Sequence, residues 1–175
     1  MSETWYAIRT FNCQEQKVSR YLSEKGLVHF IPMTFVQLEP EDESEEKPKR
    51  VLVPAIHNLL FVQKTGTHHE MYRMLSECSI PTSIFRQPGM QTPCEISDRE
   101  MVELRMLCDP QFTNSVYMSQ GEAEAMVGKE VRVTAGPFKG SVGRLVRKNK
   151  QYYFLKAIIG MGVMVRISRW YCTPL

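Results

Sequence analysis

Residues 128–145 carry the strongest structural signal in the chain, with the sequence GKEVRVTAGPFKGSVGRL. Val131 and Val133 alternate with polar or basic neighbours, and the same period of two returns at Val163, Val165 and Ile167. Side chains that alternate in this way lie on the two faces of a β-strand. Because glycines interrupt the segment at short intervals, no stretch is long enough for a helix. The pattern predicts a small, strongly curved all-β barrel over residues 127–175.

Charge is divided unevenly between this predicted barrel and the rest of the 175-residue chain. Residues 128–175 contain ten Lys or Arg and one acid, Glu130, whereas residues 1–127 contain twelve basic and eighteen acidic side chains. The net charge of +3 therefore hides a segment of +9 and a segment of −6. Such asymmetry indicates two units with different partners, and the basic unit is suited to RNA or to an acidic protein.

The first forty residues predict a strand, a helix and a second strand. Residues 5–10 are rich in strand formers. Asn12 and Glu15 have the spacing of a capping box that would start a helix, and Gly26 is placed to end it. Residues 27–38 return to strand character with a bend at Pro32. Six acids follow within residues 39–46, and their mutual repulsion predicts a mobile hairpin tip.

The middle of the chain predicts a returning strand and two further helices. Residues 49–64 have strand character with an interruption at Pro54. The pairs Thr67–Glu70 and Ser97–Glu100 are capping boxes, each followed by apolar residues at helical spacing, and a short strand is expected over residues 83–86. In the second of these helices, the inward side chains are expected to be Met101, Leu104 and Cys108.

The order strand, helix, strand, strand, helix, strand is typical of a split βαβ (ferredoxin-like) domain, with helices on one face of an antiparallel sheet. We therefore expect an α+β domain over residues 1–108. Polar residues, prolines and glycine dominate residues 109–126, which we expect to be a linker before the barrel at 127–175.

Composition and motifs argue against several other classes of protein. No nucleophile elbow, P-loop or metalloprotease motif is present, so we expect no enzyme, no catalytic residue and no cofactor. The five cysteines are scattered without a C-x-x-C pair, and the adjacent His68 and His69 point different ways around a helix, so we expect no metal site. The first residues carry no export signal and no apolar run is long enough to span a membrane, which favours a cytoplasmic protein.

Residues 128–145 resemble a KOW motif. Trp5-Tyr6, Ile31-Pro32, Leu59-Leu60-Phe61-Val62 and Ile96-Ser97-Asp98-Arg99-Glu100 resemble the N-terminal domain of the NusG family, and the pairing of these two units in this order is specific. The resemblance implies a small SH3-like all-β fold for the KOW barrel. It also implies a transcription elongation factor that rides on RNA polymerase and contacts a second partner through this barrel.

Within the family, the acidic tip, the short basic C-terminal segment and the many methionines are similar to the specialised antiterminator branch, RfaH and the UpxY regulators of capsular-polysaccharide operons. A general NusG-type elongation factor and a KOW-type RNA- or ribosome-binding protein remain as alternatives. The target operon and its DNA element are not evident from the sequence.

The resemblance also implies where partners would bind. An apolar patch containing Ile56, Leu59 and Phe61 would receive the clamp helices of the largest polymerase subunit, because alternation puts Leu59 and Phe61 on one face of their strand. The alternative is that all of these residues belong to the core. His68 and His69, at the start of a helix, would face the opposite jaw of the polymerase. We expect a monomer that does not bind membranes.

Two further surfaces are implied for other partners. Gln14, Lys17, Tyr21 and Lys25 form one stripe on the first helix, which would contact the non-template DNA strand. The turn between the first two barrel strands would contain Gly136, Pro137, Phe138, Lys139 and Gly140, with Phe138 exposed at its tip. A ribosomal protein, a termination factor or RNA would bind the KOW barrel.

Overall fold

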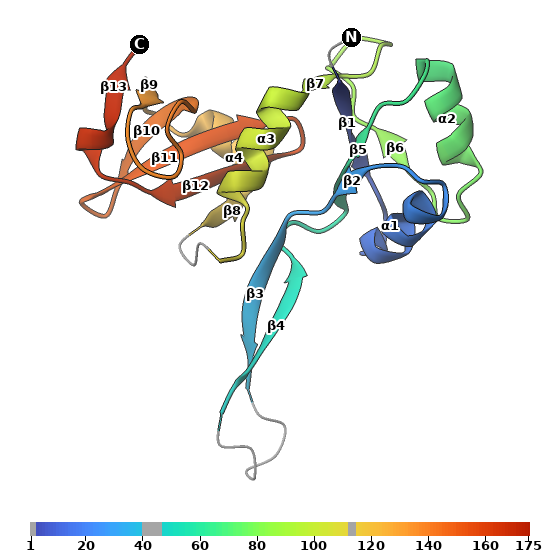
Figure 1. The fold of residues 1–175 in the computed structure, drawn as a ribbon, viewed down its shortest axis with the longest axis horizontal. Coiled ribbons are helices and arrows are strands. Elements are labelled where there is room, and N and C mark those ends of the chain that lie inside the picture. The colour runs from blue at the N-terminus through green and yellow to red at the C-terminus, as the bar shows by residue number, and fades with distance from the viewer. Residues whose placement is uncertain (1–2, 40–46, 112–114) are drawn as a thin grey trace.

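The computed structural model describes residues 3–39, 47–111 and 115–175 (Figure 1). It contains an α+β domain, a two-stranded arm that projects from this domain and a C-terminal barrel. This confirms the expected fold class. Most of the predicted acidic tip, residues 40–46, lies outside the described residues.

The sheet of the N-terminal domain is antiparallel throughout. Its strand order is β2-β5-β1-β6, and β7 also pairs with β1. The strands are β1 (Thr4–Arg9), β2 (His29–Phe30), β5 (Leu59–Gln63), β6 (Ser83–Ile84) and β7 (Ile96–Ser97). The arm is the hairpin of β3 (Met33–Leu38) and β4 (Lys49–Pro54), which pair with each other alone among the described strands.

The two faces of this sheet are covered by different elements. On one face, α1 (Glu15–Glu24) and α2 (His68–Ser76) pack through Val18, Leu22, Met71 and Leu75 onto Tyr6, Ile8, Leu60 and Val62. On the other face, α3 (Asp98–Leu107) packs onto Trp5, Ala7, Leu59 and Phe61. The expectation that all helices lie on one face is therefore wrong for α3, although its inward residues Met101, Leu104 and Cys108 are buried as predicted.

The capping boxes of α2 and α3 are confirmed, but the box expected at Asn12 is wrong. Thr67 and Ser97 accept the N3 backbone N–H, while Glu70 and Glu100 reach back to the N-cap backbone. In contrast, α1 begins at Glu15 with Gln14 as its N-cap, because Asn12 has a left-handed backbone with a φ of 56°. The Glu15 carboxylate accepts the backbone N–H of Asn58 instead.

The C-terminal barrel contains one antiparallel sheet with strand order β13-β9-β10-β11-β12-β8. Its strands are β8 (Val116–Met118), β9 (Lys129–Val133), β10 (Val142–Lys148), β11 (Gln151–Ile158), β12 (Met161–Arg166) and β13 (Cys172–Pro174), with a 3-10 turn, η1, at Arg169–Tyr171. Residues 127–175 therefore contain strands joined by turns and no α-helix, as the alternation predicts.

A strand and a helix occupy the segment for which the sequence predicted a linker. Strand β8 pairs with β12, and α4 (Gln120–Ala125) packs on the barrel through the buried Ala123. Ser119 and Glu122 form a capping box that starts α4. The helix fits closely because Gly162 has no side chain to collide with Ala123. A helix of six residues has too few apolar positions to show helical periodicity, so the sequence pattern did not reveal it.

The α2 capping box predicts a pH-dependent contribution to stability. Hydrogen bonds from the backbone and side chain of Thr67 hold the pKa of the Glu70 carboxyl below its ordinary value. A lowered folded-state pKa means that the stabilisation is present above the unfolded pKa and is lost as the pH falls through the folded pKa. We expect Glu70→Ala to lower the urea midpoint at pH 7, with a difference from the parent that shrinks as the solution is acidified through this range.

Urea unfolding followed by circular dichroism at a series of pH values checks this expectation. Glu24→Ala, at an exposed position near the end of α1, is the matched control. A constant difference between Glu70→Ala and the parent at every pH would contradict it.

Candidate functional site

The alternating side chains of β5 serve two different layers of the molecule. Leu60 and Val62 lie in the core beneath α1 and α2, whereas Leu59 and Phe61 lie on the opposite face. We call Ile56, Leu59 and Phe61 together the β5 face. Leu59 is 2% exposed and Phe61 is fully buried, while Ile56, in the connection before β5, is half-buried against the same cluster.

The barrel packs against the β5 face. Ile158, Met161 and Val163 belong to the same apolar cluster as Leu59 and Phe61. Gly160, in the turn between β11 and β12, lies so close that a Cβ atom there would be 2.8 Å from Leu59 Cδ1. The patch that the sequence predicted as a docking surface is therefore covered by a second domain and by α3. The sequence could not show this, because an apolar alternation does not reveal which element covers it.

One ion pair joins α3 to the barrel beside this contact. Lys156 Nζ on β11 lies 2.8 Å from a Glu103 carboxylate oxygen, and the two side chains are 14% and 10% exposed. The same ammonium donates to the Val142 carbonyl at 3.0 Å. Arg99, which is largely exposed, lies 3.5 Å from the other Glu103 oxygen. Glu103 is thus a largely buried acid held by a cation from the barrel.

The two candidate histidines differ in their surroundings. His68 hydrogen-bonds the Tyr6 hydroxyl and lies 3.5 Å from Glu95. A hydrogen bond from Lys64 holds the pKa of the Glu95 carboxyl below its ordinary value, whereas burial holds the pKa of the Tyr6 phenol above its own. His68 is therefore held by partners within the domain although its side chain is 39% exposed, and His69 is exposed.

The stripe on α1 is only partly available to a ligand. Lys17 is exposed and Gln14 is the N-cap, but the Tyr21 hydroxyl donates to the Met74 carbonyl of α2. Lys25 pairs with Glu77 of α2 at 3.3 Å. Tyr21 and Lys25 thus tie α1 to α2, and the ring that was expected to stack on a base is half-buried.

The turn between β9 and β10 lies where the sequence predicted it, with one correction. Gly136 and Gly140 have φ values of 83° and 93°, which other residues rarely adopt. Pro137 and Lys139 are exposed. Phe138, expected at an exposed tip, is 7% exposed and packs into the core cluster, because the turn folds back over the end of the barrel.

The sequence reasoning missed an aromatic and basic surface near the C-terminus. Trp170 is 79% exposed, and the Arg169 guanidinium lies 4.7 Å from its ring centroid. A groove of about 490 Å³ beside it is lined by Lys150, Gln151, Tyr152, Arg166, Ile167, Ser168, Arg169 and Trp170. We call this the Trp170 groove, and none of the described residues that line it is acidic. The run Arg169-Trp170-Tyr171, shortly after a strand that ends in Arg166, was the available signal.

None of the helices in the described part of the chain is both long and apolar enough to cross a membrane.

Comparisons with known proteins agree with this architecture. Residues 3–105 match the family model described as transcription termination factor NusG, and residues 127–158 match the KOW motif. Among curated protein sequences, none is similar enough to count as a match. A solved structure described as "Domain interaction in Thermotoga maritima NusG" has a similar fold, with a TM-score of 0.51 at 16% identity over 100% of this chain and 98% of that one. Because the first model spans more than half of the chain, the protein belongs to the NusG family of transcription termination and elongation factors.

Proposed function

We propose that this protein is an antitermination factor that binds RNA polymerase through the β5 face and suppresses pausing or termination. The family consists of non-enzymatic transcription factors whose members bind RNA polymerase. One observation carries the proposal for this chain: the apolar side chains of the β5 face are covered on one side by a separate domain. An apolar surface of this kind, once uncovered, is suited to bind a protein partner.

The barrel and the polymerase would then compete for the same face. A ligand shifts an equilibrium only by its preference for one state, so a polymerase that binds the β5 face must select molecules whose barrel has moved away. The apparent affinity would be reduced by the fraction of molecules that are closed. The Glu103–Lys156 ion pair would favour the closed form, because it joins α3 of the N-terminal domain to the barrel.

The proposal includes a specialist role at particular operons, such as those for polysaccharide biosynthesis. A closed form that opens only at the right elongation complex would suit a factor restricted to few sites. Sequencing nascent RNA from cells with and without the protein separates the two roles. Readthrough confined to one operon supports the specialist, and a genome-wide shift supports a general factor.

The exposed part of the α1 stripe would contact the non-template DNA strand. Lys17 and Lys25 are both exposed, but Lys25 pairs with Glu77, whereas Lys17 forms no ion pair among the described residues. A lone lysine contacts phosphate and carries little sequence information. We therefore propose that Lys17 positions the strand.

A second candidate function, binding of single-stranded RNA by the barrel, is favoured by the Trp170 groove. Proteins that bind single strands combine a basic groove with aromatic side chains on which bases stack. Trp170 and Tyr152 supply rings, and Lys150, Arg166 and Arg169 supply charge along the same groove. Trp170 is exposed while the barrel covers the β5 face, so RNA could bind the closed form.

Reversing one charge of the ion pair should open the molecule. Glu103→Lys places two ammonium groups together, so the closed form is disfavoured and the part of the β5 face that the barrel covers becomes exposed. If closed molecules predominate tenfold, the apparent affinity for core RNA polymerase should rise by about 10-fold, the limit set by the open fraction. Titration of immobilised polymerase with the full chain measures this change. The charge-swapped variant Glu103→Lys/Lys156→Glu should return to the parental affinity.

A second substitution tests whether the exposed face is the docking surface. Ile56→Asp in the Glu103→Lys background places a carboxylate on the half-buried edge of the β5 face and should abolish the gain. Equal binding by Glu103→Lys with and without Ile56→Asp would place the docking surface elsewhere.

Lys17→Ala should weaken binding to elongation complexes that expose a non-template strand. Loss of one phosphate contact should also make the salt dependence of binding less steep. Lys25→Ala, whose ammonium is already paired, is the matched control and should have a smaller effect. If the two variants lose equal affinity, α1 does not contact the strand through Lys17.

Trp170→Ala should weaken binding of a single-stranded RNA by about 10-fold, since stacking of one base on an aromatic ring contributes roughly 1–3 kcal/mol. Trp170→Phe should retain most of the affinity because it retains a ring. Fluorescence anisotropy with a labelled oligoribonucleotide measures both variants. Unchanged binding by Trp170→Ala would exclude the groove as the RNA site.

A further inference from the structure

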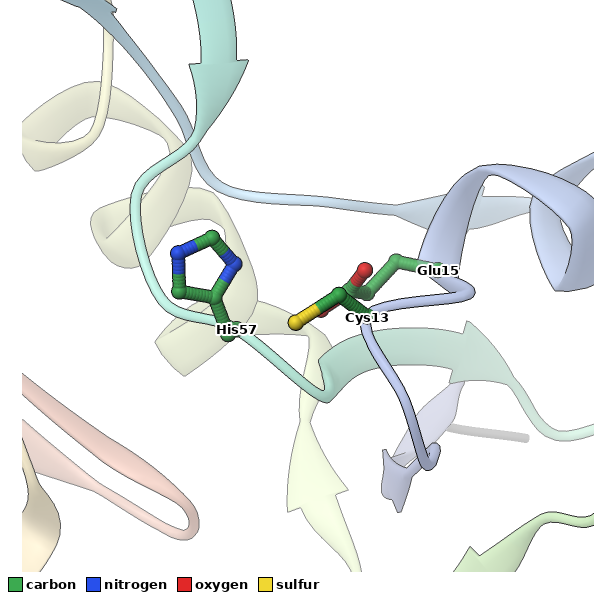
Figure 2. Close-up of side chains that lie close together, drawn as sticks. All are labelled: Cys13, Glu15 and His57. Atoms are coloured by element: carbon green, nitrogen blue, oxygen red, sulfur yellow. The ribbon is translucent and has the colours of Figure 1, made fainter.

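Three side chains with metal-ligand chemistry converge between the N-terminal turn and the β4–β5 connection. Figure 2 shows the Cys13 sulfur, the Glu15 carboxylate and the His57 ring facing one another across two chain segments. One potential ligand atom from each residue lies within 4.8 Å of the other two. Cys13 and Glu15 lie at the start of α1, and His57 lies 42 or more residues further along the chain, so the fold brings them together.

Asn58 holds the two segments in place. Its left-handed backbone, with a φ of 61°, turns the chain so that its own N–H donates to the Glu15 carboxylate. Its side-chain Oδ1 accepts the Cys13 N–H at 2.8 Å, and its carbonyl accepts the Thr10 N–H at 3.0 Å. These bonds are made by Asn58 with the backbone and Glu15, so the thiol and the imidazole take no part in them. Both of those groups remain available to a ligand.

Glu15 is a buried carboxylate without an ion-pair partner among the described residues. It is 1% exposed, and no cation among the described residues forms an ion pair with it. A buried carboxylate is costly unless it is paired or binds a metal. The Asn58 N–H occupies one acceptor position of the Glu15 carboxylate, whereas an ionised carboxylate has about four such positions. The remaining lone pairs lie beside a thiol and an imidazole, which are themselves metal ligands.

We propose that Cys13, Glu15 and His57 form a binding site for Zn²⁺. Zinc accepts thiolate, imidazole and carboxylate together, and three protein ligands leave the fourth tetrahedral position to water. Ligand atoms around tetrahedral zinc lie roughly 3.3–3.8 Å apart, given metal–ligand distances of about 2.0–2.3 Å. Closing the present 4.8 Å spread therefore needs only a small movement, and Cys13 and His57 are exposed side chains that can make it.

Bound zinc would cross-link the β4–β5 connection to the start of α1. His57 follows Ile56, whose side chain packs into the cluster between the two domains. Binding to the folded state alone stabilises that state in proportion to the logarithm of the metal concentration. The melting temperature of the full chain should therefore rise with added zinc. This inference does not depend on how the protein binds polymerase.

Titration of the full chain with Co²⁺ and then Zn²⁺ tests the site. We expect one equivalent of Co²⁺ to bind with a thiolate-to-cobalt charge-transfer band, and Zn²⁺ to displace it. Cys13→Ser should abolish the band, and His57→Ala should weaken Zn²⁺ binding by at least about 100-fold, since even outer-shell changes cost 10–100-fold. Cys78→Ser and His69→Ala, which change the same residue types elsewhere, should bind as the parent does.

The melting temperature with a chelator present shows whether each variant is folded before metal is added. Glu15→Gln retains the size of the side chain and removes its charge, so we expect it to weaken Zn²⁺ binding as well. A parent chain that binds no cobalt, a charge-transfer band that persists in Cys13→Ser, or equal zinc affinity in the parent and in folded His57→Ala would each overturn the proposal.

Discussion

The structure depends on the fact that β5 has no solvent-facing side. Its alternating residues are apolar on both faces, so two separate layers must cover it. Helices α1 and α2 cover the face of Leu60 and Val62, and α3 together with the barrel covers the face of Leu59 and Phe61. The second cover comes partly from another domain. The contact between the domains is thus a consequence of the same alternation that builds the N-terminal core.

The ion pair beside this contact is suited to a reversible closure. The free energy lost when two charges leave water offsets much of the free energy gained from their attraction, so a buried ion pair contributes little net stability. Removing one partner is destabilising, because it leaves the other charge buried without compensation. Glu103 and Lys156 are only 10% and 14% exposed, so their separation must be accompanied by solvation of both. The ion pair therefore fixes how the two domains are oriented in the closed form but adds little to its stability. Burial of the apolar cluster supplies most of the attraction between the domains.

The basic segment of the chain forms a domain with two different surfaces. The basic C-terminal segment forms a barrel that uses one side to cover the β5 face and presents Arg169 and Trp170 elsewhere. An exposed tryptophan ring beside a guanidinium is a surface on which a base of a single-stranded nucleic acid can stack. The barrel can therefore make one contact inside the molecule and another with an external ligand at the same time. The cluster of Cys13, Glu15 and His57 lies in the N-terminal domain, outside the barrel.

Local patterns along the chain were sufficient for the α+β and barrel classes, for the boxes at Thr67 and Ser97, and for the two faces of β5, because these features depend on residues close in sequence. They failed where distant residues compete. Asn12 has a left-handed backbone and does not cap α1, while Glu15 binds Asn58 instead. Phe138 is buried in the core cluster, and α4 packs closely on the barrel because Gly162 leaves room for Ala123. The barrel also covers Leu59, and Cys13 lies close to His57, although these segments are far apart in the sequence. Periodicity could not predict either contact, because it shows which face of one helix or strand is apolar and not which element packs against that face.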